Sequence, residues 1–319
     1  MSAAPPGPEG GSPAGAAPNG GHPSQGGGQR PRRERPQEAR LAPEAIAAAR
    51  GDAREGLDWL GREPETKASP LYRSLRLLAR AVFFGVFRFR VETSGQEHVP
   101  GGGYLLVAAV HRGWMDPFLV QHALPVEPRA WFLGSAPTAF SSRWREWLLH
   151  RVGGMLPVWR GGVGIDVHVA SAEAVLRAGG VFVIMAEGGI PGPPDRLAPF
   201  RSGSALIAIR TRAPIVPLAM VGSKELYIGR RMATRVLAPT SAEALLGAAL
   251  GDPGPEPGSR EELDLAHELT ERLAAMLQPV VTELYPGTVD PPVRPRRFRG
   301  LTWLFIARPK ASRDGQDVP

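Results

Sequence analysis

The chain has 319 residues, and none of them is cysteine. Without cysteine there are no disulfide bonds, no thiolate nucleophile and no cysteine-type zinc site, and the sequence is compatible with a reducing cytoplasm. Histidine is sparse too, and no cluster of residues suggests a metal site. We therefore expect no metal and no bound cofactor. The histidines other than His111 are His22, His98, His122, His150, His168 and His267.

Long hydrophobic runs are also missing. No uninterrupted apolar stretch approaches the roughly 20 residues that a helix needs to cross a bilayer. The amino terminus lacks the basic segment followed by an apolar segment that marks a secretory signal. A G-x-S-x-G motif is absent as well, so we expect no serine nucleophile of that kind. These absences predict a protein of the cytosol or of a membrane surface.

Acidic residues are fewer than basic ones, 31 against 38, which gives a net charge of +7. A basic balance favours an anionic partner such as phospholipid, nucleic acid or an acidic substrate. The basic residues gather in the tails and on one apolar-faced segment rather than on an aromatic-studded sheet. We therefore expect a phospholipid surface as partner and no nucleic acid.

The two ends of the chain differ from its middle. Gly, Pro, Ala and Ser dominate the first part of residues 1–66, which predicts a disordered amino-terminal tail and linker. A folded domain is expected over 67–290, and a basic amphipathic tail over 291–319. In that tail Trp303 and Phe305 lie among arginines, which suits a membrane interface. The alternative is that the tail packs back on the domain.

Residues 71–90 combine apolar side chains at roughly helical spacing with interspersed arginines. A helix of this kind can lie in the headgroup plane of a membrane with its apolar face in the bilayer. It can equally be an ordinary helix packed on the core with solvated arginines. The apolar positions are Leu71, Leu75, Leu78, Val82 and Phe89, with Phe83 and Phe84 nearby.

From Gly103 onward, short apolar runs alternate with longer amphipathic segments. This alternation is typical of strands joined by crossover helices, so the sequence predicts the α/β class, with a mostly parallel central sheet flanked by helices. The expected strands are 104–110, 130–134, 155–159, 181–186, 215–221 and 231–237. The expected helices are 117–124, 140–152, 166–178, 203–211 and 260–284, with a surface loop at 251–258.

His111 stands where the first of these strands ends and a helix is about to begin. Asp116 followed by Pro117 is a helix-start signal, because the carboxylate can accept from exposed N–H groups and proline is favoured in the first turn. A turn of this length can also fold the carboxylate back onto the imidazole, orienting it and stabilising the imidazolium formed when it takes a proton. Alternatively, Asp116 is only a cap and His111 only a loop histidine. The carboxyl end of a strand, where α/β sheets place their sites, favours the first interpretation.

Three further stretches belong with His111, and the first two follow predicted strands. Arg160 comes before two glycines and can offer a bidentate fork to an oxyanion. Glu187 precedes Gly188 and Gly189, a combination that fits hydroxyl positioning and backbone stabilisation of a developing oxyanion, and fits a tight turn equally well. The third stretch, 214–217, has proline at both ends and predicts a strand or pocket wall.

Together these stretches resemble the glycerolipid acyltransferase family typified by 1-acylglycerol-3-phosphate acyltransferase. The family's His-x4-Asp block matches His111 to Asp116, including the proline that follows. Its G-A-I-P-V-D-R-G block matches 154–161, and its F-P-E-G-T-R block matches 185–190. A basic-glycine segment at 199–203 and the fourth block at 214–217 follow in the same order, so the resemblance covers roughly residues 80 to 240.

The resemblance implies direct acyl transfer, with no acyl-enzyme. His111 would deprotonate an acceptor hydroxyl while Asp116 holds the imidazole, and the oxygen would attack the thioester of acyl-CoA or acyl carrier protein. The implied acceptor is a lysophospholipid, and the implied place is the cytoplasmic face of the cell membrane, as a peripheral protein of phospholipid biosynthesis. The implied substrate-binding residues are Arg160, Glu187, Gly188, Gly189, Arg196 and Arg201.

Departures from the family pattern concern the acceptor. Gly189 and Ile190 stand where the family has threonine and arginine, and Trp159 stands where it has an acid. A basic pair usual after the second strand is replaced by 134–136. The family associates these positions with an acceptor phosphate. An acceptor without phosphate, such as a glycolipid or a lipoamino acid, therefore remains an alternative, as does a catalytically idle lipid-binding protein.

Overall fold

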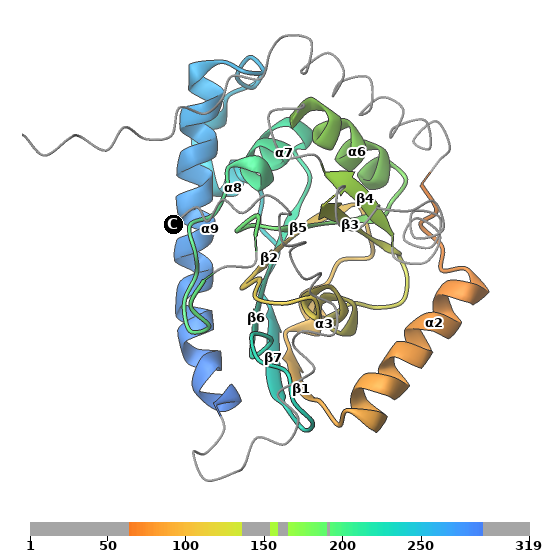
Figure 1. Ribbon diagram of the computed structural model, residues 1–319. Helices are drawn as coiled ribbons and strands as arrows, with labels where there is room; N and C mark the ends of the chain where they lie inside the picture. The colour runs from red at the N-terminus through yellow and green to blue at the C-terminus, as the bar shows by residue number, and fades with distance from the viewer. Residues whose placement is uncertain (1–63, 136–153, 159–164, 190–191, 290–319) are drawn as a thin grey trace, which may run out of the picture. The chain divides into compact units, whose positions relative to one another are not determined.

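The computed structural model describes residues 64–135, 154–158, 165–189 and 192–289 (Figure 1). All of them belong to the larger of the two units into which the chain divides, residues 41–319. The predictions for 1–63, for the helix at 140–152 and for 290–319 lie outside the described residues. The predicted domain boundaries at 66 and 290 therefore stay predictions.

A seven-stranded sheet with the order β1-β7-β6-β2-β5-β3-β4 organises the described residues. All neighbouring strands in it run parallel except β6 and β7, which are antiparallel. This confirms the predicted class, a mostly parallel sheet flanked by helices. The strands are β1 (Arg90–Ser94), β2 (Tyr104–Ala109), β3 (Ala130–Ser135), β4 (Met155–Val158), β5 (Val181–Met185), β6 (Ile215–Val221) and β7 (Arg231–Val236).

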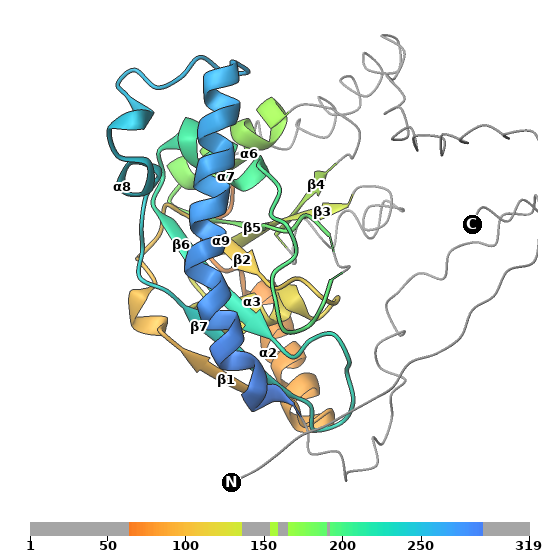
Figure 2. The same cartoon turned by 90° about the vertical axis from the view of Figure 1, so that its left-hand side faces the viewer.

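Helices cover both faces of the sheet, and the central strand β2 is buried along its whole length. Its residues alternate between two cores, as the pleat of a strand requires. Leu105 and Val107 pack with α6 (Ile165–Arg177), α7 (Gly203–Thr211) and α9 (Arg260–Thr288). Leu106 and Ala108 pack on the other face with α3 (Asp116–Ala123) and with aromatic residues that follow α2 (Pro70–Arg80). Figure 2 shows α9 crossing in front of the strands, with α2 and α3 behind them.

The predicted helix at 71–90 ends earlier than expected. An α-helix over α2 passes into a π-helical turn at Ala81–Val86, Arg88 takes a left-handed backbone conformation (φ 53°), and the edge strand β1 begins at Arg90. The expectation of helix up to Arg90 was therefore wrong. The local reason is that Arg88 turns the chain, so that Arg90 to Ser94 can pair with β7.

The other strands and helices lie within a few residues of their predicted ends. The prediction missed the short helix α8 (Ala242–Leu246), which Ser241 caps, and the 3-10 turns at Gln96–His98 and Gly247–Leu250. It also ended the last helix at 284, whereas α9 continues to Thr288 through Pro279 and Pro286. The loop at 251–258 is present as expected.

Candidate active site

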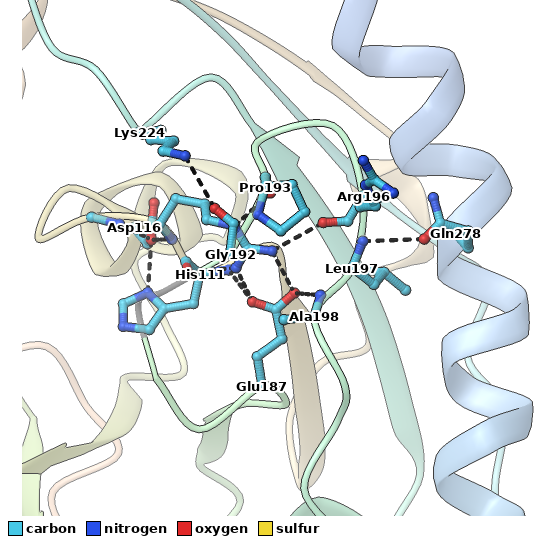
Figure 3. A network of polar contacts seen from close by, with 12 residues as sticks. His111, Asp116, Glu187, Gly192, Pro193, Arg196, Leu197, Ala198, Lys224 and Gln278 are labelled. Atoms are coloured by element: carbon cyan, nitrogen blue, oxygen red, sulfur yellow. Dashed lines mark hydrogen bonds and ion pairs between the residues drawn. The ribbon is translucent and has the colours of Figure 1, made fainter. Parts of the chain in front are cut away.

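The end of β2 delivers His111 to the carboxyl edge of the sheet, and the amino end of α3 delivers Asp116 opposite it. His111 Nδ1 lies 2.7 Å from Asp116 Oδ2. The imidazole side chain is 17% exposed and the carboxylate 0%, so the ring can be reached from solvent while the acid cannot. The expectation that the carboxylate folds back onto the ring is confirmed (Figure 3).

A helix begins at Asp116 with Pro117 in its first turn, as the sequence predicted, but Asp116 is not the cap of that helix. Met115 occupies the cap position without a side-chain cap bond, and Asp116 is the first helical residue. Its Oδ2 accepts instead from the backbone N–H groups of Arg112 (2.7 Å) and Gly113 (2.8 Å), both upstream of the helix. The correction follows from this geometry, because an oxygen facing the 111–113 loop cannot also reach the N–H groups of the first turn of α3.

Gly113 is required at the tip of this loop. A Cβ at this position would lie 2.9 Å from the carbonyl oxygen of Ser223, in the loop after β6. That distance is shorter than real Cβ contacts, so any side chain would push the two loops apart. The glycine therefore lets the 111–116 turn close tightly around the Asp116 carboxylate.

Glu187, which follows β5, lies next to the His111–Asp116 pair, but its carboxylate is bonded to groups of the protein itself. Its side chain is 1% exposed and forms a two-pronged ion pair with Arg112, whose side chain is 2% exposed. The N–H groups of His111 (3.1 Å) and Ala198 (2.9 Å) also donate to it. The predicted contact between Glu187 and substrate therefore finds no support in this geometry.

Gly188 and Arg201 come together beside Glu187. Gly188 has φ +63°, and a Cβ there would lie 2.3 Å from Cδ of Arg201, so the stem of this arginine lies where only glycine leaves room. The Gly188 N–H donates to Met185 within the turn (2.9 Å), whereas Gly189 N–H has no acceptor among the described residues. Of the two backbone N–H groups predicted to stabilise an oxyanion, only that of Gly189 is unoccupied.

Arg196 and Arg160 complete the predicted set. Arg196 is exposed, with its guanidinium 3.8 Å from Asp195, while its carbonyl faces Arg112. Arg160 lies outside the described residues, so its predicted role stays a prediction. Among the described residues no group of three histidine, aspartate or glutamate side chains is placed to hold a metal.

Sequence reasoning missed Arg112 and Lys224. Arg112 ties the 111–113 loop to Glu187, and Lys224 reaches over the loop after β5, with Nζ 3.2 Å from the Gly192 carbonyl (Figure 3). The sequence places a basic residue three positions after β2 and an acid two positions after β5. These two positions predict an ion pair only once β2 and β5 are known to be neighbours, with Ala108 opposite Met185.

A mostly parallel α/β sheet with a histidine–aspartate pair at its carboxyl edge has the geometry that general-base catalysis requires. The acyltransferase family model matches residues 90–221, which contain β1 to β6 and every site residue predicted from the sequence. This match to the acyltransferase family supports the resemblance that the motifs between His111 and Pro217 indicated.

Several chains of solved structures match this chain. One of them is the 1-acyl-sn-glycerophosphate (LPA) acyltransferase PlsC from Thermotoga maritima, with 19% sequence identity and a TM-score of 0.44. The match covers 65% of this chain and 80% of the PlsC chain. No curated protein sequence matches the chain.

Proposed function

We propose that this protein is a peripheral membrane O-acyltransferase of phospholipid biosynthesis. It transfers a fatty acyl group from acyl-CoA or acyl carrier protein to a hydroxyl of a lysophospholipid. The observation that carries the proposal is the 2.7 Å contact between His111 Nδ1 and Asp116 Oδ2, with the acid buried and the ring partly exposed. The family supplies the reaction class.

The chemistry follows from which imidazole nitrogen is occupied. A carboxylate beside Nδ1 favours the tautomer with its proton on Nδ1, which leaves Nε2 as the base. Nε2 takes the proton of the acceptor hydroxyl, and the oxygen attacks the thioester carbonyl. The C–O bond forms, the C–S bond breaks, and the proton passes from Nε2 to the leaving thiolate. Gly189 N–H is the backbone donor available to the developing oxyanion.

For the acceptor we propose an anionic headgroup, held by Arg201 and Arg196 after β5, with Arg160 as a further member. Arg201 lies against Gly188 and its side chain has no acidic partner among the described residues, so its charge is available to a ligand. The alternative, an acceptor without phosphate, is supported by Gly134 and Ser135 in β3, because they are uncharged where the family has basic residues.

The membrane as partner is supported by the unusual orientation of α2. Its arginines face the domain: Arg73 bonds to Glu127 (2.5 Å), and Arg76 bonds to the carbonyls of Pro125 (2.8 Å) and Leu124 (2.5 Å). Three of its four leucines are exposed instead, with Leu75 half-buried, whereas a helix packed on a core buries its apolar side chains. The exposed apolar side chains of α2 and the turn after it are Leu71 (45%), Leu77 (69%), Leu78 (57%) and Val86 (66%).

We propose that this outward face lies in the cytoplasmic leaflet of the cell membrane. Arg88 and Arg90, both exposed at the end of this segment, supply the positive charge that an anionic leaflet attracts. In the described part of the chain, no helix is both long and apolar enough to span a membrane.

The substitution His111→Ala tests the transfer chemistry. We expect the rate of thioester consumption by purified protein, with acyl-CoA and lysophosphatidic acid, to fall on the order of 10²–10⁴-fold, the contribution of a positioned base. His267→Ala is the matched control, because that histidine is exposed on α9. An unchanged rate in His111→Ala would refute the mechanism.

A panel of acceptors separates the two proposed acceptor classes. Lysophosphatidic acid and lysophosphatidylglycerol are compared with a monoacylated glycolipid and an N-acyl amino acid, using the same acyl donor. We expect the phosphate-bearing lipids to be preferred and Arg201→Gln to raise their KM. A preference for the phosphate-free lipids, with no effect of Arg201→Gln, would establish the alternative.

A further inference from the structure

The buried ion pair between Arg112 and Glu187 lies directly behind His111 and takes no part in the transfer chemistry above. We propose that Arg112 is a positioning residue of this site: paired with Glu187, it fixes the backbone of His111 and the loop 192–198 without touching substrate. This inference rests on the proposed function for its effect on rate, but its effect on the geometry of His111 can be measured independently.

Every donor of Arg112 is used. A guanidinium has five N–H donors in a fixed planar fork. Nε donates to the Pro193 carbonyl (2.7 Å). Nη1 donates to the His111 carbonyl (2.7 Å) and to Glu187 Oε2. Nη2 donates to Glu187 Oε1 (3.1 Å) and to the Arg196 carbonyl (3.0 Å). No donor is left for a substrate.

Every acceptor position of Glu187 is used as well. A carboxylate offers about four lone-pair sites. Two of them accept from Arg112, one from His111 N–H (3.1 Å) and one from Ala198 N–H (2.9 Å). Both the N–H and the C=O of His111 are therefore held by this one ion pair. The peptide groups on either side of the imidazole cannot turn without breaking it.

The same pair holds the loop that carries Arg196. Arg112 binds two of its carbonyls and Glu187 one of its N–H groups, while Leu197 N–H donates to Gln278 of α9 (3.1 Å) on the far side. The loop is thereby fixed between β2 and α9 (Figure 3). Displacing Arg112 is expected to move the base and this loop together.

Lysine cannot replace Arg112, because an ammonium has three donors and no planar fork. Gly192 shows how closely the loop fits the guanidinium: a Cβ there would lie 2.7 Å from Arg112 Cζ. Two substitutions therefore disturb the pair in different ways. Arg112→Lys removes the planar fork. Gly192→Ala keeps both charges, but its added methyl group displaces the guanidinium.

The experiment compares three readouts in wild type, Arg112→Lys and Gly192→Ala. Thermal unfolding reports folding, steady-state kinetics with acyl-CoA and lysophosphatidic acid report kcat and KM, and the downfield proton resonance of His111 Nδ1–H reports its bond to Asp116. The resonance is assigned by its loss in His111→Ala. We expect both variants to lose or broaden this resonance. We also expect kcat to fall on the order of 10²-fold, as for a misplaced catalytic group, while KM changes little.

Arg210→Lys is the matched control. Arg210, which is half-buried, forms a second two-pronged pair with the buried Glu262 (2.6 and 2.8 Å), between α7 and α9 and outside the site. The Arg210→Lys substitution should lower the unfolding temperature and leave both kcat and the His111 resonance unchanged. A merely structural role of Arg112 would make the two lysine variants behave alike.

Each result decides the inference. A folded Arg112→Lys protein with wild-type kcat and an intact Nδ1–H resonance would overturn it. If Arg112→Lys does not fold, Gly192→Ala decides by the same two readouts. If the wild-type protein transfers no acyl group, the proposed function fails, and the resonance alone then shows whether Arg112 positions His111.

Discussion

Single residues in this site are constrained by backbone space as much as by charge, and Gly188 illustrates this. Its left-handed conformation (φ +63°) disfavours any side chain, and Arg201 occupies the place of a Cβ. We expect Gly188→Ala to lower the unfolding free energy by about 1–2 kcal/mol for the conformation, plus the cost of moving Arg201. We also expect it to weaken acyl transfer, because Arg201 is the proposed headgroup ligand.

Gly179→Ala separates these two effects. Gly179 has a similar conformation (φ +79°), but no atom lies within 4 Å of a Cβ there. Urea denaturation of both variants measures the loss of unfolding free energy. In Gly179→Ala this loss comes from the backbone conformation alone, and in Gly188→Ala it also includes the cost of displacing Arg201. Equal losses of stability, with unchanged activity in Gly188→Ala, would contradict the contact between Gly188 and Arg201.

The two residue pairs of the site were not equally predictable. His111 and Asp116 are five positions apart, so the turn between strand and helix sufficed to predict their contact. Arg112 and Glu187 are 75 positions apart. Their contact depends on β2 and β5 being neighbours in the sheet, and the order of strands is not written in any local pattern. Glu187 was therefore predicted as a substrate ligand rather than as the partner of Arg112.

At the scale of elements, predictability followed burial. The strands rich in Val, Ile and Leu, such as β2, β5 and β6, were found from their apolar runs. The edge strand β1 reads Arg-Val-Glu-Thr-Ser and is largely exposed or half-buried, so it carries no comparable signal. Helix α8 is five residues long and too short to show a period. The sequence did not predict β1 and α8 because these elements depend on contacts with the rest of the fold rather than on a local pattern.

Helices α7 and α9 are joined by the ion pair between Arg210 and Glu262, whose side chain is 1% exposed. The hydrogen bonds from Arg210 hold the pKa of Glu262 below its ordinary range. Because the folded-state pKa is depressed, this carboxylate stabilises the fold at pH values above its ordinary pKa. The stabilisation is lost as the pH falls through the folded-state pKa, where the carboxylate becomes protonated.

We therefore expect Glu262→Gln to lower the unfolding free energy at pH 7 by about 3 kcal/mol, the lower end for breaking a buried pair, since Asp166 still faces Arg210 (2.5 Å). The difference from wild type should shrink as the pH is lowered below the ordinary carboxyl range. Urea denaturation at several pH values measures this. Glu173→Gln, in an exposed pair with Arg177, is the control and should cost well under about 1 kcal/mol. A difference that is independent of pH would contradict the assignment.

For the whole molecule, the proposed membrane face and the site are linked through α2 and α3. Arg76 of α2 donates to carbonyls at the end of α3, and the ring centroids of Phe83 and Phe118 of α3 lie 4.9 Å apart in an edge-on contact. Asp116 is the first residue of that same helix. A bilayer that takes up the exposed leucines of α2 would thus hold α3, and with it the acid of the proposed catalytic pair, next to the lipid that carries the acceptor.

The double substitution Leu77→Ser, Leu78→Ser tests this arrangement. Transfer of each leucine side chain from water into the bilayer is favourable by up to about 1.5–3 kcal/mol. We therefore expect the affinity for vesicles containing phosphatidylglycerol to fall at least roughly tenfold. Sedimentation with these vesicles, and with phosphatidylcholine vesicles at low and high salt, measures the apolar and the charged contributions separately, because salt screens only the latter. Leu263→Ser is the control, since Leu263 is 52% exposed but lies on α9. If the double variant binds vesicles as tightly as this control does, α2 is not the membrane face, and the acceptor must reach His111 by a route that does not involve this helix.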